Sequence, residues 1–154
     1  MKKAELLELV GGAHARLGRS LEGLSEGEAG RTGLTAKWSI KDALAHITAW
    51  EQEGARLLGG ILDGTARPRR YPEEEIERFN EEAVGARRGR TLDELLGETR
   101  AGHAAMLAAV ARLPDEVDEN SPAYKIAHGF TVEHMTHHAA QIEKYRESSI
   151  VRES

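Results

Sequence analysis

Two histidines near the end of the chain, His134 and His138, have the spacing of a metal-binding pair. They are four residues apart, so on a helix they lie one above the other on the same face. Two neutral imidazoles in that arrangement can bind one divalent cation. The same spacing also occurs by chance among solvated surface histidines, and the pair alone leaves that interpretation open.

The segment around this pair, residues 131–145, reads TVEHMTHHAAQIEKY and has the pattern of an amphipathic helix. Its apolar stripe lies directly beside the two histidines and consists of Val132, Met135, Ala139 and Ile142. A helix with this stripe buries that side in a bundle, which directs the neighbouring imidazoles inward. Gln141 and Tyr145 continue the histidine ridge. His137 lies about 100° round the helix from His138 and is expected to point away, although a register shift would let it replace its neighbour.

Four further histidines are predicted to have ordinary structural roles when each is considered alone. His46 lies at the edge of a wide apolar stripe, where a histidine bonded to a backbone carbonyl is typical. His103 lies on an apolar stripe and is expected to be a buried, hydrogen-bonded core residue. His14 is predicted to lie on the surface, and His128 at a helix start or in a loop.

Helical periodicity covers most of the chain, and no stretch alternates apolar and polar residues over the length of a strand. We expect long helices over residues 2–24, 39–62, 91–113 and from 131 onward, and a short acidic helix over residues 72–85. Ser39 and Asp42 form a capping-box pattern at the start of the second long helix. The sequence therefore predicts an all-α four-helix bundle with a short extra helix between the second and third long helices. The bundle domain is expected to span residues 1–147, followed by a flexible tail over residues 148–154.

Composition narrows the function classes. The chain has 154 residues and no cysteine, which suits a single domain and excludes thiolate metal sites and a cysteine nucleophile. Its net charge is −5 with mixed signs, from which we expect no nucleic-acid partner. No apolar run has the length of a membrane span, so we expect no membrane partner and, by default, a cytoplasmic protein.

Two segments resemble known signatures. Residues 38–47, WSIKDALAHI, followed by Trp50 and Glu51, resemble the second-helix signature of the DinB-like superfamily. Residues 134–142, in which His134 and His138 precede Ala139-Ala140-Gln141-Ile142, are similar to its last-helix signature. The resemblance covers residues 34–146 and is greatest to the ClbS/DfsB branch.

The resemblance implies a four-helix bundle, often a homodimer, with a three-histidine metal site formed by His46, His134 and His138. The expected ion is nickel or zinc, with water in the open positions. Three imidazoles with water is also the composition of a catalytic, open site, which can polarise a carbonyl or activate water.

Relatives of this kind imply a hydrolase or a thiol-dependent transferase that acts on a small reactive metabolite, with a low-molecular-weight thiol as a second substrate. The alternative is a non-catalytic bundle that binds or sequesters a small molecule. Helical geometry nominates Glu53 and Tyr145 as candidate proton-transfer residues, while Asp42 is already explained as a cap.

Overall fold

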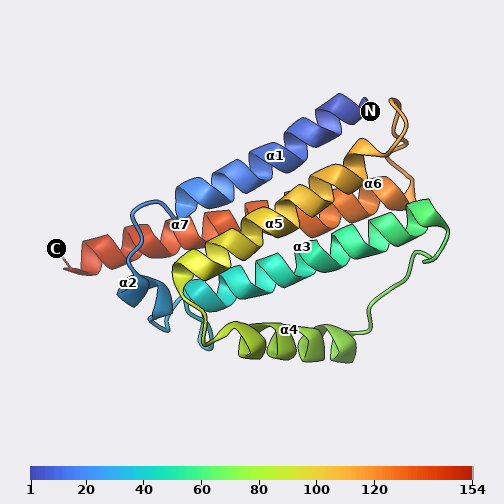
Figure 1. Cartoon of the computed structure of the whole chain (residues 1–154). Coiled ribbons are helices and arrows are strands. Elements are labelled where there is room, and N and C mark those ends of the chain that lie inside the picture. Colours follow the sequence, from blue (N-terminus) through green and yellow to red (C-terminus); the bar gives the residue numbers. More distant parts are fainter. Residues whose placement is uncertain (154) are drawn as a thin grey trace.

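The computed structural model describes residues 1–153. Within that range every regular secondary-structure element is a helix. Four long helices form a bundle and share one long direction (Figure 1). They are α1 (Lys3–Ser20), α3 (Ile40–Asp63), α5 (Leu92–Ala111) and α7 (His134–Glu153). Helix α3 packs against α5, and α1 packs against α7. The predicted all-α four-helix bundle is confirmed.

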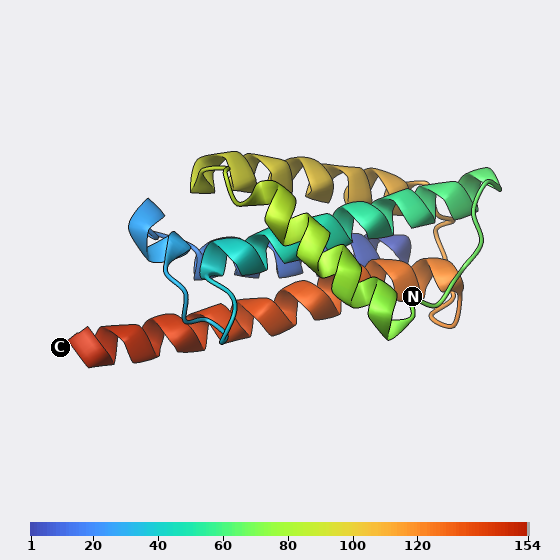
Figure 2. The same ribbon diagram turned by 90° about the horizontal axis from the view of Figure 1, so that it is seen from below.

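The extra helix α4 (Glu73–Arg87) lies in the connection between α3 and α5, as predicted. It crosses α3 obliquely on the outside of the bundle (Figure 2). Pro72 stands at its N-cap, and three glutamates follow in the first turn, where they suit the helix dipole. Ala83 and Val84 are buried, so the inner face of α4 is held by apolar contacts.

Three short elements were not predicted: the segments of the first two and residues 128–129 of the third were interpreted as connections, and residues 131–133 were predicted as the start of the last long helix. They are α2 (Glu26–Gly30), α6 (Pro122–Ala127) and a π-helix, η1 (His128–Glu133). Ser25 and Glu28 form a capping box for α2, and Ser121 caps α6 with Pro122 in its first turn. The first helix ends at Ser20 rather than at residue 24, and the following turn contains Gly23 with a φ of 70°.

Helix α7 continues to Glu153, so its end does not mark the predicted domain boundary at residue 147. The flexibility of residues 148–154 stays a prediction, and Ser154 lies outside the described residues. Among residues 1–153, no helix combines the length and the hydropathy needed to cross a membrane.

The core consists of two apolar clusters separated by a polar layer. One cluster contains Leu17, Leu44 and Met135, and the other contains Leu6, Leu58 and Met106. Along the helices the buried polar side chains of Thr48, Glu51, Thr99, His103 and Thr131 fall between the two clusters, and those of His46 and His138 lie beside residues of the first cluster. Buried polar groups require partners, so this layer is where specific chemistry is expected.

Candidate metal site

The structure brings together the three histidines that the resemblance nominated. His46 comes from α3, and His134 and His138 come from the first two turns of α7. One ring nitrogen from each lies within 4.8 Å of the other two. The Nε2 atoms of His46 and His134 are 2.8 Å apart. This spacing places three nitrogen donors around a single point between two facing helices.

Asn80 of α4 fixes the tautomer of His46. Its Oδ1 atom lies 2.7 Å from Trp50 Nε1 and 2.8 Å from His46 Nδ1. An indole N–H can only donate, so the Asn80 atom that faces it is the carbonyl oxygen. His46 Nδ1 must then carry a proton and donate as well. The consequence is that His46 presents the lone pair of Nε2 to the other histidines.

The other two rings are held differently. His138 Nδ1 lies 2.9 Å from Gln141 Oε1, one helical turn further along α7. When that nitrogen donates to Gln141, the Nε2 of His138 is left as a lone pair for the cluster. His134 Nδ1 is buried and has no partner within the described residues. A buried polar atom without a partner is rare in proteins and is typical of functional sites.

Burial keeps all three imidazoles neutral. It lowers the pKa of His46 from 6.5 to about 4 and the pKa of His134 to about 3, and the neighbouring histidines add to the effect. The pKa of His138 is also lowered, again chiefly by burial. Neutral imidazole is the form that binds metal. Three close, neutral nitrogen donors therefore fit a divalent transition-metal ion, and the Trp38 ring, 4.8 Å from the His46 ring, shields one side.

The two candidate proton-transfer residues point elsewhere. Glu53 Oε1 accepts a hydrogen bond of 3.1 Å from the Tyr71 hydroxyl, and the same carboxylate pairs with Arg56. The Tyr145 hydroxyl lies beside Gly33 in the loop before α3. Their assignment as catalytic residues thus stays a prediction that these contacts do not support.

The remaining predictions near the site have mixed outcomes. Asp42 caps α3 with Ser39 as expected, and His137 is exposed on α7. His128 begins the π-helix. The prediction that His14 is a surface residue was wrong, because its ring is partly buried and stacks on His103 at 3.9 Å.

A second polar cluster, next to the three histidines along α3, was missed by the sequence reasoning. Glu51 is fully buried, and its Oε2 accepts a hydrogen bond of 2.7 Å from Thr131 and lies 3.4 Å from His103 Nδ1. Its Oε1 has no partner among the described residues. Thr131 belongs to the π-helix directly before His134, so this contact ties the start of the site to the core.

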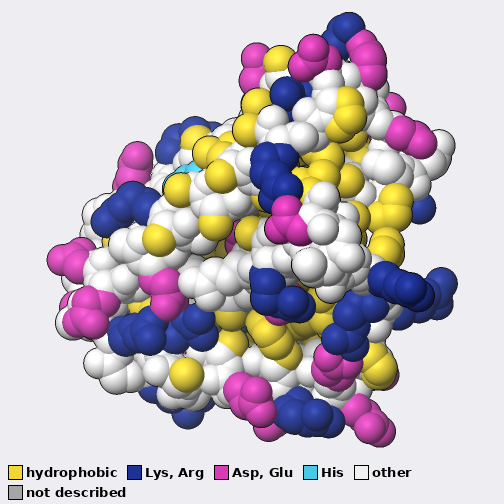
Figure 3. Space-filling view, turned by 45° about the vertical axis from the view of Figure 1, so that its right-hand side comes forward, with side chains coloured by type: hydrophobic (Ala, Val, Ile, Leu, Met, Phe, Trp, Pro, Cys, Tyr) yellow, Lys and Arg dark blue, Asp and Glu magenta, His cyan; other side chains and the backbone are white. Residues whose placement is uncertain are grey.

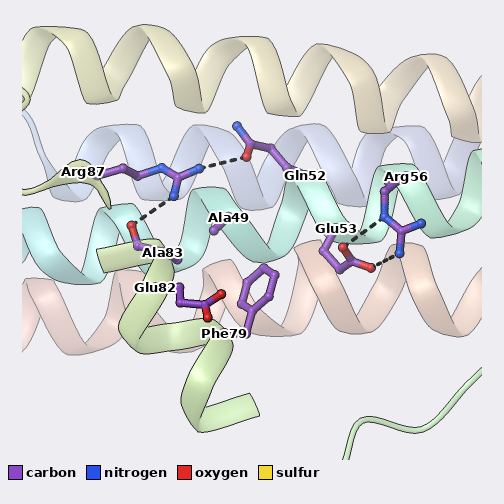
Figure 4. Close-up of a pocket in the computed structure, with 8 residues that line it drawn as sticks. All are labelled: Ala49, Gln52, Glu53, Arg56, Phe79, Glu82, Ala83 and Arg87. Carbon is purple, nitrogen blue, oxygen red and sulfur yellow. Dashed lines mark hydrogen bonds and ion pairs between the residues drawn. The ribbon is translucent and has the colours of Figure 1, made fainter. Parts of the chain in front are cut away.

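The site opens into a cavity of about 350 Å³ with mainly apolar walls. His46 and His134 are among its lining residues, and the others are Trp50, Tyr71, Ile76, Lys125, Gly129 and Phe130. A separate cavity of about 340 Å³ lies between α3 and α4 (Figure 4). Glu53 pairs with Arg56 there, Arg87 donates to the amide oxygen of Gln52, and no histidine lines this cavity. We therefore place the candidate chemistry in the first cavity.

Together these features define a class: a helical bundle with a three-histidine cluster between the second and last long helices. Residues 9–142 match the family model of the DinB superfamily. The chain therefore belongs to the DinB superfamily, and the predicted resemblance is confirmed. Among curated proteins, none matches this chain in sequence.

Solved structures agree with this assignment. The sibling lethal factor precursor DfsB is 16% identical, with a TM-score of 0.82 and 97% of each chain covered. The colibactin self-resistance protein ClbS, in complex with double-stranded DNA, is 13% identical, with a TM-score of 0.79 and coverage of 94% and 95%. A Streptococcus pneumoniae protein is 12% identical, with a TM-score of 0.79 and coverage of 96% and 91%. At these identities the likeness concerns the fold.

The ClbS complex corrects one expectation. We had excluded nucleic-acid partners because of the net charge of −5, and a protein with this fold nevertheless binds double-stranded DNA. Net charge sums over the whole molecule, whereas phosphate contacts need only a local group of cations. On the face shown in Figure 3, Lys and Arg side chains lie among acidic and hydrophobic ones, which illustrates how little the sum says about any one region.

Proposed function

We propose that this protein is a divalent-metal-dependent enzyme that hydrolyses a small reactive metabolite or transfers a thiol to it. The observation that supports the proposal is the set of three neutral histidines, His46, His134 and His138, beside an apolar cavity. The residues suit nickel or zinc, which bind imidazole well. A closed structural site would supply a fourth protein ligand, and within residues 1–153 no carboxylate joins the three rings.

The roles of the protein groups follow from their contacts. The three imidazoles would hold the ion, which when bound supplies Lewis-acid chemistry toward a carbonyl or water. Asn80 and Gln141 orient His46 and His138 through the ring nitrogens that face away from the cluster. Trp38 and Trp50 exclude bulk water around His46, which strengthens electrostatic interactions at the site.

The proposal is tested by turnover of small electrophiles, such as activated esters and epoxides, with and without a low-molecular-weight thiol. Protein reconstituted with nickel or zinc should convert at least one of them. The His138→Ala variant should lose that turnover, while the His137→Ala variant, with an exposed ring on the same helix, should keep it. Ligands that are retained stoichiometrically and recovered unchanged from the loaded protein would instead establish the non-catalytic binding function.

A second candidate partner is double-stranded DNA, which ClbS binds. In this chain several surface cations are already paired, for example Arg69 with Glu75 and Arg112 with Asp63. Fluorescence anisotropy with a labelled duplex at several salt concentrations tests this partner. Binding that weakens steeply with salt would support it, because phosphate contacts release counterions.

A further inference from the structure

The cavity beside the three histidines has an aromatic wall. The rings of Trp50, Tyr71 and Phe130 surround it, with centroid separations of 5.4 Å, 5.8 Å and 6.0 Å between the pairs. Ile76 completes the apolar lining. Rings arranged in this way accept a flat apolar body by stacking or edge contacts. A volume of about 350 Å³ lies at the low end for ligand pockets, so the occupant is small.

The charged side chain that lines this cavity is positive. None of its lining residues is acidic, and Lys125 is the cation among them. Within the described residues the Lys125 ammonium has no ion pair and no hydrogen bond, and the residue is exposed. Three aromatic rings could also form a cage for a cation, but an unpaired ammonium at the rim opposes one.

The carboxylate of Glu53, which is bonded to the lining residue Tyr71, does not change this balance. Glu53 accepts a hydrogen bond from the Tyr71 hydroxyl and pairs with Arg56, which neutralises it. The Tyr71 phenol itself stays neutral, because burial and Glu53 raise its pKa to about 12. The cavity therefore combines apolar walls with one uncompensated positive charge.

We propose that this cavity binds a small molecule with a flat apolar, preferably aromatic, body and a single carboxylate. The carboxylate contacts Lys125, and the body stacks among Trp50, Tyr71 and Phe130. His46 and His134 line the same cavity, so a bound molecule of this kind lies next to them. This inference deepens the proposed function by naming the substrate class of the same site.

The test uses 2-naphthoate and its neutral amide, 2-naphthamide, as matched probes with metal-free protein. Isothermal titration calorimetry should show tighter binding of the carboxylate than of the amide. Lys125→Gln should weaken 2-naphthoate binding about five-fold, the size expected for a partly exposed ion pair, and leave 2-naphthamide binding unchanged. Lys144→Gln, which removes an exposed lysine on α7, is the control and should change neither.

A second variant locates the probe. Gly129 lines the cavity, and a Cβ there would meet no atom within 4 Å. Gly129→Leu should fill that space and remove binding of both probes. A neighbouring cavity also contains Lys125 but is not lined by Gly129, so loss of binding in this variant assigns the probes to the cavity beside the histidines.

The proposal is overturned if neither probe binds the parent protein, if Lys125→Gln binds 2-naphthoate as tightly as the parent, or if Gly129→Leu binds both probes normally. Metal content of the reconstituted samples is measured separately. A protein that holds metal but not the probes would contradict this inference alone, and one that binds the probes but no metal would contradict only the proposed function.

Discussion

The Nε2 atoms of His46 and His134 face each other at 2.8 Å, although the two residues are 88 positions apart in the chain. Two lone pairs at that distance repel, so either one nitrogen carries a proton or both bind a cation. Asn80 keeps the His46 proton on Nδ1, so in the metal-free protein His134 must donate from its Nε2. His134 Nδ1 is then a buried acceptor without a partner. For His134 to bind a metal ion through Nε2, its proton would have to move to Nδ1, a change of tautomer that leaves the ring neutral.

Asn80→Leu should weaken metal binding about 10–100-fold, because it removes the acceptor that orients His46. It should also cost about 1–3 kcal/mol of stability, since the Trp50 N–H loses its partner. The Asn80→Asp variant keeps an acceptor oxygen and should retain most of the metal affinity. Competition titration with a chelating dye measures the metal affinity of both variants, and urea denaturation measures their stability. Equal loss in the two variants would show that Asn80 does not act through its oxygen.

Gly54→Ala should destabilise the fold by about 1–3 kcal/mol, because the added Cβ would lie 2.7 Å from Phe130 Cβ and 2.8 Å from its Cγ. The control is Gly59→Ala on the same helix, where a Cβ meets nothing within 4 Å. That change should stabilise the protein by about 0.5–1 kcal/mol through helix propensity. Urea denaturation distinguishes the two, and similar effects at both positions would contradict the close approach of α3 to the π-helix.

Thr131→Val should cost about 1–3 kcal/mol, because it removes the hydroxyl that donates to the buried Glu51 carboxylate. Thr136→Val makes the same substitution at a partly exposed site on α7 and should change stability by less than about 0.5 kcal/mol. Thermal unfolding of the two variants tests this. A Thr131→Val protein as stable as the control would mean that the Glu51–Thr131 bond does not hold the π-helix.

Stability of the metal-free protein should fall as the pH is lowered from 7 to 5. The pKa of His46 is lowered from 6.5 to about 4, and that of His134 to about 3, so the folded chain stays neutral at these rings while the unfolded chain takes up protons below pH 6.5. Protonation therefore favours the unfolded state, with a loss on the order of 2 kcal/mol for each ring across this window. Urea titrations at several pH values measure it. A double His46→Gln, His134→Gln variant should show a flatter profile, and an equally steep one would assign the effect to other groups.

The sequence predicted the long helices because each carries an apolar stripe, and α3 and α5 also have clear caps at their starts. It could not decide the role of His46, since periodicity places that residue at a core edge and only packing against α7 turns it toward His134. Asn80 could have been noticed as a polar residue on the apolar face of α4, between Ile76 and Ala83. Glu51 and the π-helix left no local signal, because their contacts depend on tertiary packing.

The central claim is that His46, His134 and His138 hold one divalent metal ion. Elemental analysis of untagged protein, after reconstitution with nickel or zinc and removal of excess ion, tests it most directly. We predict about one ion per chain in the parent and in His137→Ala, and loss of the ion in His46→Ala and His138→Ala. A parent protein that holds no ion, or a His138→Ala variant that keeps it, would contradict the account.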